Sequence, residues 1–200
     1  MVVLALRTAA AAAGWLTQAW PVLLALALLA GAVGVWRLRQ GATARRRERE
    51  RLAALRISLA EFDAMDDRNF EYALRDLLVR DGCAARRVGG AGDQAADVIS
   101  DHPRLGRIVV QAKHTRVSGK VGSSVMYAVK GTARPVHKAA HAVVVTNGTF
   151  TRDAMAWGDL YGVHWVDRDK LQQWAQDGAA LHELLGLSVR SRPSRFKRAA

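Results

Sequence analysis

The apolar positions of the chain form one long uninterrupted run near the N-terminus and a series of shorter runs after it. From Thr8 to Trp36 no residue is charged, and residues 19–36 carry no polar side chain. In a helix, about 20 apolar residues are enough to cross a hydrocarbon core about 30 Å thick. The pattern therefore predicts one transmembrane helix at residues 15–36, preceded by an N-terminal segment at residues 1–14.

Arginines gather directly after this apolar run. Residues 37–61 are rich in arginine and are predicted to form a helical linker. Because positive charge that follows a span favours the cytoplasmic side, we expect residues 37–200 to lie in the cytoplasm. The chain is thus predicted to be a single-pass protein of the cell inner membrane.

A cleaved signal peptide is the alternative, because residues 9–13 are small. The length of the apolar run and the arginines that follow it favour a retained anchor. The single cysteine, Cys83, cannot form an intrachain disulfide and fits a reducing compartment. We expect it to be a buried, unreactive core residue.

Shorter apolar runs alternate with amphipathic ones between residues 62 and 187, which we predict to be the folded domain. The predicted elements are, in order, a helix from Asp66 or Asp67 to Arg80, strands at 84–88, 97–100 and 107–114, a helix at 118–132, a strand at 142–145, a helix at 151–160, a strand at 163–166 and a helix at 168–176. Apolar strands between helices indicate a mixed α/β sheet covered on both faces. Residues 188–200 are basic and aperiodic, which is typical of a disordered tail.

The net charge of +12 is distributed unevenly along the chain. Residues 37–51 carry +5 and residues 190–200 carry another +5, whereas residues 52–189 hold 17 basic and 16 acidic side chains. Within this nearly neutral segment, nine Lys or Arg and no Asp or Glu lie between His102 and Arg152. Such segregation is the expected footprint of a polyanion approaching one face of the domain.

Four residues with the chemistry of a metal-dependent active site occur in this region. Asp97 follows a glycine-rich turn at the start of one predicted strand, and Gln111 and Lys113 project from the same side of the next strand. If the two strands pair, the three side chains meet in one pocket, and Glu71 can lean toward it from the first helix. Carboxylate and amide oxygens are the ligands that Mg²⁺ uses, and a neighbouring lysine can orient water or stabilise charge on a phosphate.

The order of these motifs resembles the Mrr-like restriction endonuclease domain, which has the PD-(D/E)xK nuclease fold. The match covers about residues 66–176. It is carried by Phe70-Glu71, the run from Gly89 through Asp93 and Asp97 to Ile99, Val110-Gln111-Ala112-Lys113, the run from Val143 to Thr151 with Ala154, and Val166-Asp167 before Leu171. One departure is Ala95, which stands where the family usually has a glycine and requires a backbone angle compatible with a Cβ.

The resemblance implies a mixed central sheet flanked by helices and Mg²⁺-dependent cleavage of DNA, which is methylated DNA for several members of the family. It implies that Asp97 binds the metal, that Gln111 fills the second acidic slot, that Lys113 is the catalytic lysine and that Glu71 supports the metal site. Together with the basic region, it leads us to expect DNA contacts from Arg116, Lys120, Lys130, Arg134, Lys138 and Asn147.

The sequence therefore predicts a membrane-anchored, Mg²⁺-dependent DNA endonuclease that acts in restriction of foreign or methylated DNA. A catalytically inactive, membrane-tethered DNA-binding or scaffold module is the alternative, and an RNA or repair substrate stays open because phosphate contacts carry no base identity. A single metal site cuts one strand, so double-strand cleavage would require a homodimer or repeated nicking. The six histidines are scattered and give no zinc-protease pattern.

Overall fold

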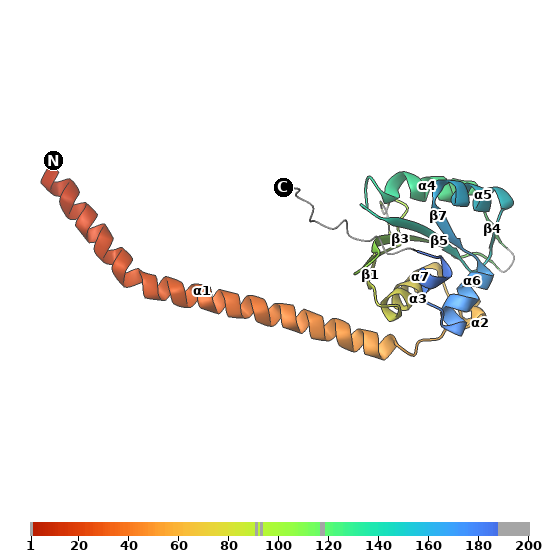
Figure 1. Cartoon of the computed structure of the whole chain (residues 1–200), viewed down its shortest axis with the longest axis horizontal. Coiled ribbons are helices and arrows are strands. Elements are labelled where there is room, and N and C mark those ends of the chain that lie inside the picture. The colour runs from red at the N-terminus through yellow and green to blue at the C-terminus, as the bar shows by residue number, and fades with distance from the viewer. Residues whose placement is uncertain (1, 91, 93, 117–118, 188–200) are drawn as a thin grey trace, which may run out of the picture. The chain divides into compact units, whose positions relative to one another are not determined.

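The computed structural model describes residues 2–90, 92, 94–116 and 119–187, with side chains from residue 20 onward. The predicted basic tail lies outside these residues, as does Asp93. The chain divides into two compact units, residues 1–47 and residues 48–200, which are considered separately (Figure 1).

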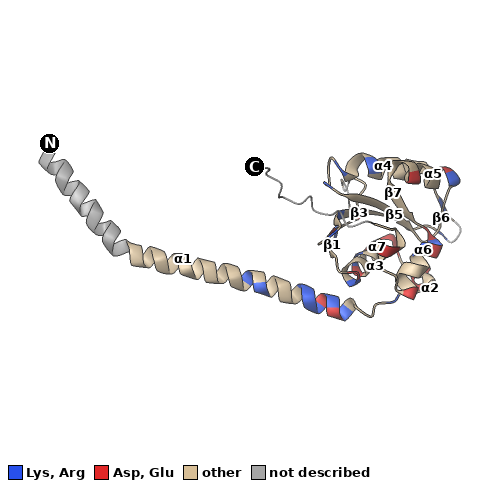
Figure 2. Cartoon of the chain, in the orientation of Figure 1, with Lys and Arg blue, Asp and Glu red and all other residues tan. Residues whose placement is uncertain are grey.

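The N-terminal unit is a single helix, α1, which runs from Val2 to Leu52 and continues into the second unit. Its portion from Trp20 to Leu52 has a mean hydropathy of 1.9 in its most apolar window, none of which is buried. By length and composition this is the one helix of the described chain that can cross a membrane, and near an N-terminus a signal sequence meets the same criteria. Lys and Arg side chains gather toward its C-terminal end (Figure 2). The predicted helical linker thus continues without a break from the apolar helix and ends at Leu52.

The second unit alternates helices and strands as the sequence predicts. Its elements are α2 (Leu59–Ala64), α3 (Asp67–Arg80), β1 (Ala84–Arg87), β2 (Val98–His102), β3 (Gly106–Lys113), β4 (Lys120–Val121), α4 (Ser123–Ala133), β5 (His141–Thr146), β6 (Thr149–Phe150), α5 (Arg152–Tyr161), β7 (Val163–Val166), α6 (Arg168–Gln172), a π-helical turn (Gln173–Asp177) and α7 (Leu181–Leu184). Asp66 and Thr151 cap α3 and α5 by accepting hydrogen bonds from backbone amides three residues later.

Five strands form one mixed sheet in the order β1-β2-β3-β5-β7. The first three pair antiparallel, and β3, β5 and β7 run parallel. Because successive residues of a strand point to opposite faces, Val110 and Val143 pack against the side of α3, whereas Val109 and Val144 pack against α4 and α5. Helices thus cover both faces of the sheet (Figure 1), and the predicted mixed α/β fold is confirmed.

Two predicted helices have different bounds in the structure. The helix expected from residue 118 begins only at Ser123, because Lys120 and Val121 pair with Thr149 and Phe150 as a small second sheet. The last predicted helix changes after Gln172 from α-helical to π-helical hydrogen bonding. Neither change leaves a periodic signal in the sequence, since both depend on contacts with distant residues.

The packed domain includes residues that precede its predicted start at residue 62. Ile57 is buried in the core, and its amide donates to the carbonyl of Ala175 at 3.2 Å. Ser58 and Glu61 then form a capping box at the start of α2. This segment brings α2 against the side of the sheet where the candidate site begins.

A buried ion pair anchors the end of α3 to the C-terminal part of the domain. The Arg80 and Asp81 side chains are each only 5% exposed and lie 2.9 Å apart. Arg80 also donates to the carbonyl of Trp174 at 2.8 Å, and Asp81 accepts from the Trp174 indole at 2.7 Å and the Leu181 amide at 2.8 Å. Each charged group is therefore well supplied with hydrogen-bond partners, as a buried charge requires.

Replacement of Asp81 by Asn should lower the free energy of unfolding by about 3 kcal/mol, because Arg80 is left as a buried charge without its counter-ion. Urea unfolding of the full chain followed by far-UV circular dichroism measures this loss. Asp177→Asn, at an exposed carboxylate, is the matched control and should change stability little. A loss no larger than that of the control would show that the pair does not hold the domain together.

Candidate active site

A pocket of about 510 Å³ lies at the end of β3, on the face of the sheet covered by α4. Its walls come from α3, the segment before β2, the end of β3 and the first half of α4. The lining residues are Asp67, Glu71, Ala95, Asp97, Gln111, Ala112, Lys113, His114, Ser124, Val125 and Ala128. All four residues predicted to be catalytic, namely Glu71, Asp97, Gln111 and Lys113, thus line one pocket.

Asp97 is held rigidly in this pocket. Its side chain is 5% exposed, and its backbone bonds to Val110 on β3 and to Val88 and Gly89 after β1. The carboxylate oxygen Oδ2 accepts hydrogen bonds from the Ala112 amide at 2.7 Å and from the Gln111 side chain. These bonds fix the direction of the carboxylate.

Gln111 and Lys113 are placed by the register of the sheet. Val98 pairs with Val110, and continuing this antiparallel register puts Asp97 opposite Gln111. Lys113 is two residues further along β3 and therefore projects from the same face as Gln111. Gln111 is buried and Lys113 partly buried, so the lysine lies at the wall of the pocket.

Glu71 reaches the same space from α3, and Gly89 shows how closely the two acidic groups approach. A Cβ atom at Gly89 would lie 2.6 Å from Glu71 Oε2 and 3.1 Å from Asp97 Oδ1. The two carboxylates therefore converge within 3.1 Å of a single point that only a residue without a side chain leaves open. Arg87 on β1 binds the same oxygen of Glu71, with Nε 2.5 Å from Oε2.

The oxygen atoms that converge here suit a hard divalent cation. Two carboxylates and one carboxamide are ligands of the kind used by Mg²⁺, which retains several waters and is held by few protein groups. Among the described residues no group of three or more His, Cys, Asp or Glu side chains is arranged to hold a metal ion, so a cation here would depend on two carboxylates and the Gln111 carboxamide. Cys83 lies away from this pocket in the core, and burial raises the pKa of its thiol to about 11.

The segment before Asp97 adopts a conformation that side chains disfavour. Gln94 and Ala95 have φ angles of 52° and 61°, in the left-handed region. Ala95 therefore takes a glycine-like conformation at the position where the Mrr-like domain, which the sequence resembles, usually has glycine. The turn geometry is retained in spite of the Cβ, at a cost in backbone strain next to the pocket.

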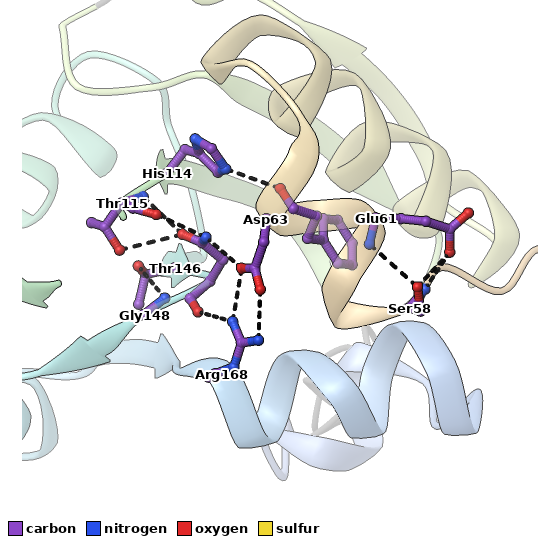
Figure 3. A network of polar contacts seen from close by, with 10 residues as sticks. Ser58, Glu61, Asp63, His114, Thr115, Thr146, Gly148 and Arg168 are labelled. Atoms are coloured by element: carbon purple, nitrogen blue, oxygen red, sulfur yellow. Dashed lines mark hydrogen bonds and ion pairs between the residues drawn. The ribbon is translucent and has the colours of Figure 1, made fainter. Parts of the chain in front are cut away.

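A polar network holds the backbone that follows Lys113 (Figure 3). Arg168, the first residue of α6, binds both carboxylate oxygens of Asp63 at 2.8 and 2.7 Å. Asn147 donates to Asp63 at 3.0 Å and accepts from the Thr115 amide at 2.7 Å. The network ties α2 and α6 to the ends of β3 and β5, and so fixes the exit of the strand that carries Lys113.

This arrangement corrects the prediction for Asn147 as a DNA contact. The residue is fully buried, and both polar atoms of its amide bond to protein groups. Its position directly after an apolar strand suggested an exposed loop, but pairing with Asp63, which is 84 residues away in sequence, draws the side chain inward. We therefore assign Asn147 to the support of the pocket.

Three further residues at the pocket were not singled out as site residues from the sequence. His114 lies 2.9 Å from the carbonyl of Phe62 and 3.2 Å from Asp67, and Arg87 pairs with Glu71. Asp67 and His114 both line the pocket. In the sequence Asp67 resembles an ordinary helix-start residue and Arg87 an ordinary strand residue, so neither is recognised as part of a site. His114 directly follows Lys113 and is the one of the three that its position makes a candidate.

The basic residues predicted to bind DNA fall into two groups. Arg116, after β3, and Lys120, in β4, are exposed and lie in the sequence between the lining residues His114 and Ser124 of this pocket. Lys130, Arg134 and Lys138 lie at the other end of α4 and beyond it, around a second pocket. In Figure 2, segments of the ribbon coloured for Lys and Arg lie at both ends of the α4–α5 layer.

A mixed sheet in which Asp97 and a Gln-x-Lys strand meet around one pocket defines a nuclease-type domain. Residues 62–175 match the Mrr_cat family, described as restriction endonuclease, and the chain belongs to this family. The resemblance seen in the sequence is thus confirmed, and the folded domain is of the restriction endonuclease type.

Two solved structures are similar to the chain. One is a protein of unknown function, AF1548, with a TM-score of 0.49 and 13% identity, covering 59% of this chain and 66% of that one. The other is the MspJI restriction endonuclease in complex with a 27-mer oligonucleotide, with a TM-score of 0.43 and 20% identity, covering 64% of this chain and 33% of that one. No curated protein matches the chain.

The hydrogen bond from Arg168 is the main reason that the pKa of Asp63 is held below its ordinary value of 3.8. A carboxyl whose pKa is lower in the folded state stabilises the fold above its unfolded pKa, and this stabilisation disappears as the pH falls through the folded pKa. Asp63→Asn should therefore reduce the free energy of unfolding by about 1–2 kcal/mol at pH 7, and the difference from wild type should shrink toward pH 3.

Urea unfolding at several pH values between 7 and 3 measures this difference, with Asp177→Asn as the control. A difference between wild type and Asp63→Asn that stays constant over this range would contradict the assigned charge pair.

Proposed function

We propose that the chain is a membrane-anchored, Mg²⁺-dependent DNA endonuclease that hydrolyses phosphodiester bonds. The observation that carries the proposal is the convergence of Asp97, Glu71, Gln111 and Lys113 on one pocket of about 510 Å³ within a domain of the restriction endonuclease family. Each of these residues has the chemistry that this reaction needs. Packing of an apolar core gives no reason for these four polar side chains to line one pocket.

Asp97, Glu71 and the amide oxygen of Gln111 would hold the magnesium ion. When bound, the ion supplies Lewis-acid polarisation of the scissile phosphate and charge neutralisation. The protein contributes a carboxylate that needs no reorganisation, because Asp97 is already fixed by the Ala112 amide. Arg87 holds Glu71 in place and limits its negative charge before the cation arrives.

Lys113 acts next to this cation site. Its ammonium group projects from the same face of β3 as Gln111, and its three donors can orient an attacking water and stabilise charge on the phosphate. The network through Thr115 and Asn147 fixes the backbone that follows it, and so holds the main chain from which the lysine projects.

DNA reaches the pocket over the exposed cations Arg116 and Lys120. The stretch from His102 to Arg152 has no acidic residue, so the approach of a polyanion meets little repulsion beyond the active site itself. Membership of the restriction endonuclease family supports a role against foreign or methylated DNA, and α1 would keep the domain at the cytoplasmic face of the inner membrane where such DNA arrives.

Asp97→Ala and Lys113→Ala should each reduce Mg²⁺-dependent plasmid cleavage by at least about 100-fold, because each removes a group that acts on the reacting phosphate. The assay uses methylated and unmethylated plasmid, and a structured RNA, each with Mg²⁺ and with EDTA. Arg104→Gln, at an exposed arginine outside the pocket, is the matched control and should keep full activity. Full activity in either alanine variant would reject the assignments.

The alternative is a tethered DNA-binding module without turnover. The ion pair between Arg87 and Glu71 favours it, since it occupies one of the two carboxylates. The same assay separates the two functions, because an inactive module binds DNA equally in EDTA and never shortens it on any substrate.

The membrane anchor is tested separately. The full chain should sediment with membranes and resist extraction by alkaline carbonate, whereas a chain without residues 1–40 should be recovered in the soluble fraction, because the apolar helix is the only membrane-length segment of the described chain. In cells, the truncated chain should protect less against incoming DNA at equal abundance. Equal sedimentation or undiminished protection would count against the anchor or its role.

A further inference from the structure

A second pocket of about 510 Å³ lies at the end of α4 opposite the candidate active site. Its nine lining residues include three cations, Lys130, Arg134 and Lys138, and no acidic residue. His141 and Gly162 also line it. His141 is the first residue of β5, and Gly162 directly precedes the first residue of the parallel strand β7. The pocket therefore opens at the beginning of these strands, and none of its described residues lines the active-site pocket.

The cations of this pocket are available to a ligand. Lys130 donates to the carbonyl of Tyr161, which fixes its direction. The side chains of Arg134 and Lys138 make no hydrogen bond or ion pair with any described residue, although the Lys138 amide bonds to the Arg134 carbonyl at 3.2 Å. A guanidinium and an ammonium that line one pocket, with no acidic side chain in its lining, are groups that bind phosphate.

The usual explanation of a cation at a helix end covers only part of this cluster. Lys130 lies in the last turn of α4, where a positive charge is favoured by the exposed carbonyls. Lys138 lies beyond the helix, and its φ of 54° puts it in the left-handed region, which is unfavourable for a lysine. The left-handed conformation ends the turn that follows α4, whereas the helix carbonyls do not account for the charge of Lys138 in the lining of the pocket.

Backbone strain connects this pocket to the active site. The described non-glycine residues with positive φ are Gln94, Ala95 and Lys138. His137, next to Lys138, contacts the carbonyl of Gln94 through Nε2 at 3.2 Å. Ala95 lines the active-site pocket and Lys138 lines the second pocket, so a single side-chain contact joins two strained segments, each belonging to one of the pockets.

We propose that the second pocket binds a phosphate group and that its occupancy is transmitted through His137 and Gln94 to the backbone that precedes Asp97. Phosphate binding itself is independent of the proposed nuclease activity, and only its consequence for cleavage rests on that function. Coupling between two sites is reciprocal. A phosphate ligand that favours the active arrangement of the loop is therefore bound more tightly in the second pocket when the active site is occupied.

Phosphate binding is tested by isothermal calorimetry of inorganic phosphate with the detergent-solubilised full chain in EDTA. The variants assign the binding to the second pocket, because the active-site pocket is lined by Lys113 and His114 as well as by Asp67, Glu71 and Asp97. Binding should be saturable, and Arg134→Gln and Lys138→Gln should each weaken it about tenfold through loss of a charge-assisted hydrogen bond.

Arg152→Gln is the matched control, because Arg152 is an exposed cation at the opposite end of α5 from the pocket. It should leave the affinity unchanged. Absence of saturable binding, or equal affinity in the Arg134→Gln/Lys138→Gln double variant, would overturn the proposal.

The source of the phosphate is distinguished by a second titration with a short DNA duplex under the same conditions. If the two substitutions weaken duplex binding as they weaken phosphate binding, the pocket holds the backbone of the substrate away from the cut. If they weaken only inorganic phosphate, the pocket serves a free phosphate-bearing ligand. Either result supports a phosphate site, and an unchanged affinity for both probes contradicts it.

Coupling is measured by amide hydrogen exchange of residues 94–97 in EDTA, so that it is read without catalysis. Phosphate should slow exchange at these residues at least about threefold in the wild-type chain, by stabilising the loop against local opening. His137→Ala should bind phosphate with unchanged affinity but lose this protection. Protection that persists in His137→Ala, or that never appears while phosphate binds, would refute transmission through this contact.

Discussion

The candidate site depends on the antiparallel pairing of β2 with β3. The hydrogen bond from the Asp97 amide to the Val110 carbonyl sets the register, and the same register brings the Asp97 carboxylate to the Ala112 amide and opposite Gln111. A slip of one residue would turn Gln111 and Lys113 to the side of α3 and bury them among the leucines of that face. The chemistry of the pocket is therefore specified by strand pairing, and the helices supply its walls and its second carboxylate.

Much of this could be predicted from the sequence, because the signals are local. The β-branched strands, the caps Asp66 and Thr151, and the alternation that puts Gln111 and Lys113 on one face all act over a few residues. The parts that were missed depend on distant partners. Asp63 and Arg168 are 105 residues apart, and the sequence around them contains no signal that the two residues bind one another. The same contact explains why Asn147, which follows a strand like a loop residue, is buried.

Charge shows a similar limit. The stretch from His102 to Arg152 has no acidic residue, and the sequence therefore predicts a concentration of positive charge there. In the sequence this is one region, whereas in the fold its basic residues lie at two separate places. Residues near β3 border the active-site pocket, and residues at the end of α4 surround the second pocket. An α-helix of 11 residues separates them, so a single electrostatic pattern in the sequence serves two places on the surface.

The clamp formed by Asp63, Asn147 and Arg168 also sets an order of events in biosynthesis. A chain that is made from its N-terminus completes α1 long before Arg168, so the ion pair between Asp63 and Arg168 can form only after the whole of that helix has been made. The end of β3, and with it Lys113, is consequently fixed late, when nearly the whole domain has been made. A chain that ends before Arg168 therefore lacks the partner of Asp63, and the segment that follows Lys113 has lost one of the contacts that fix it.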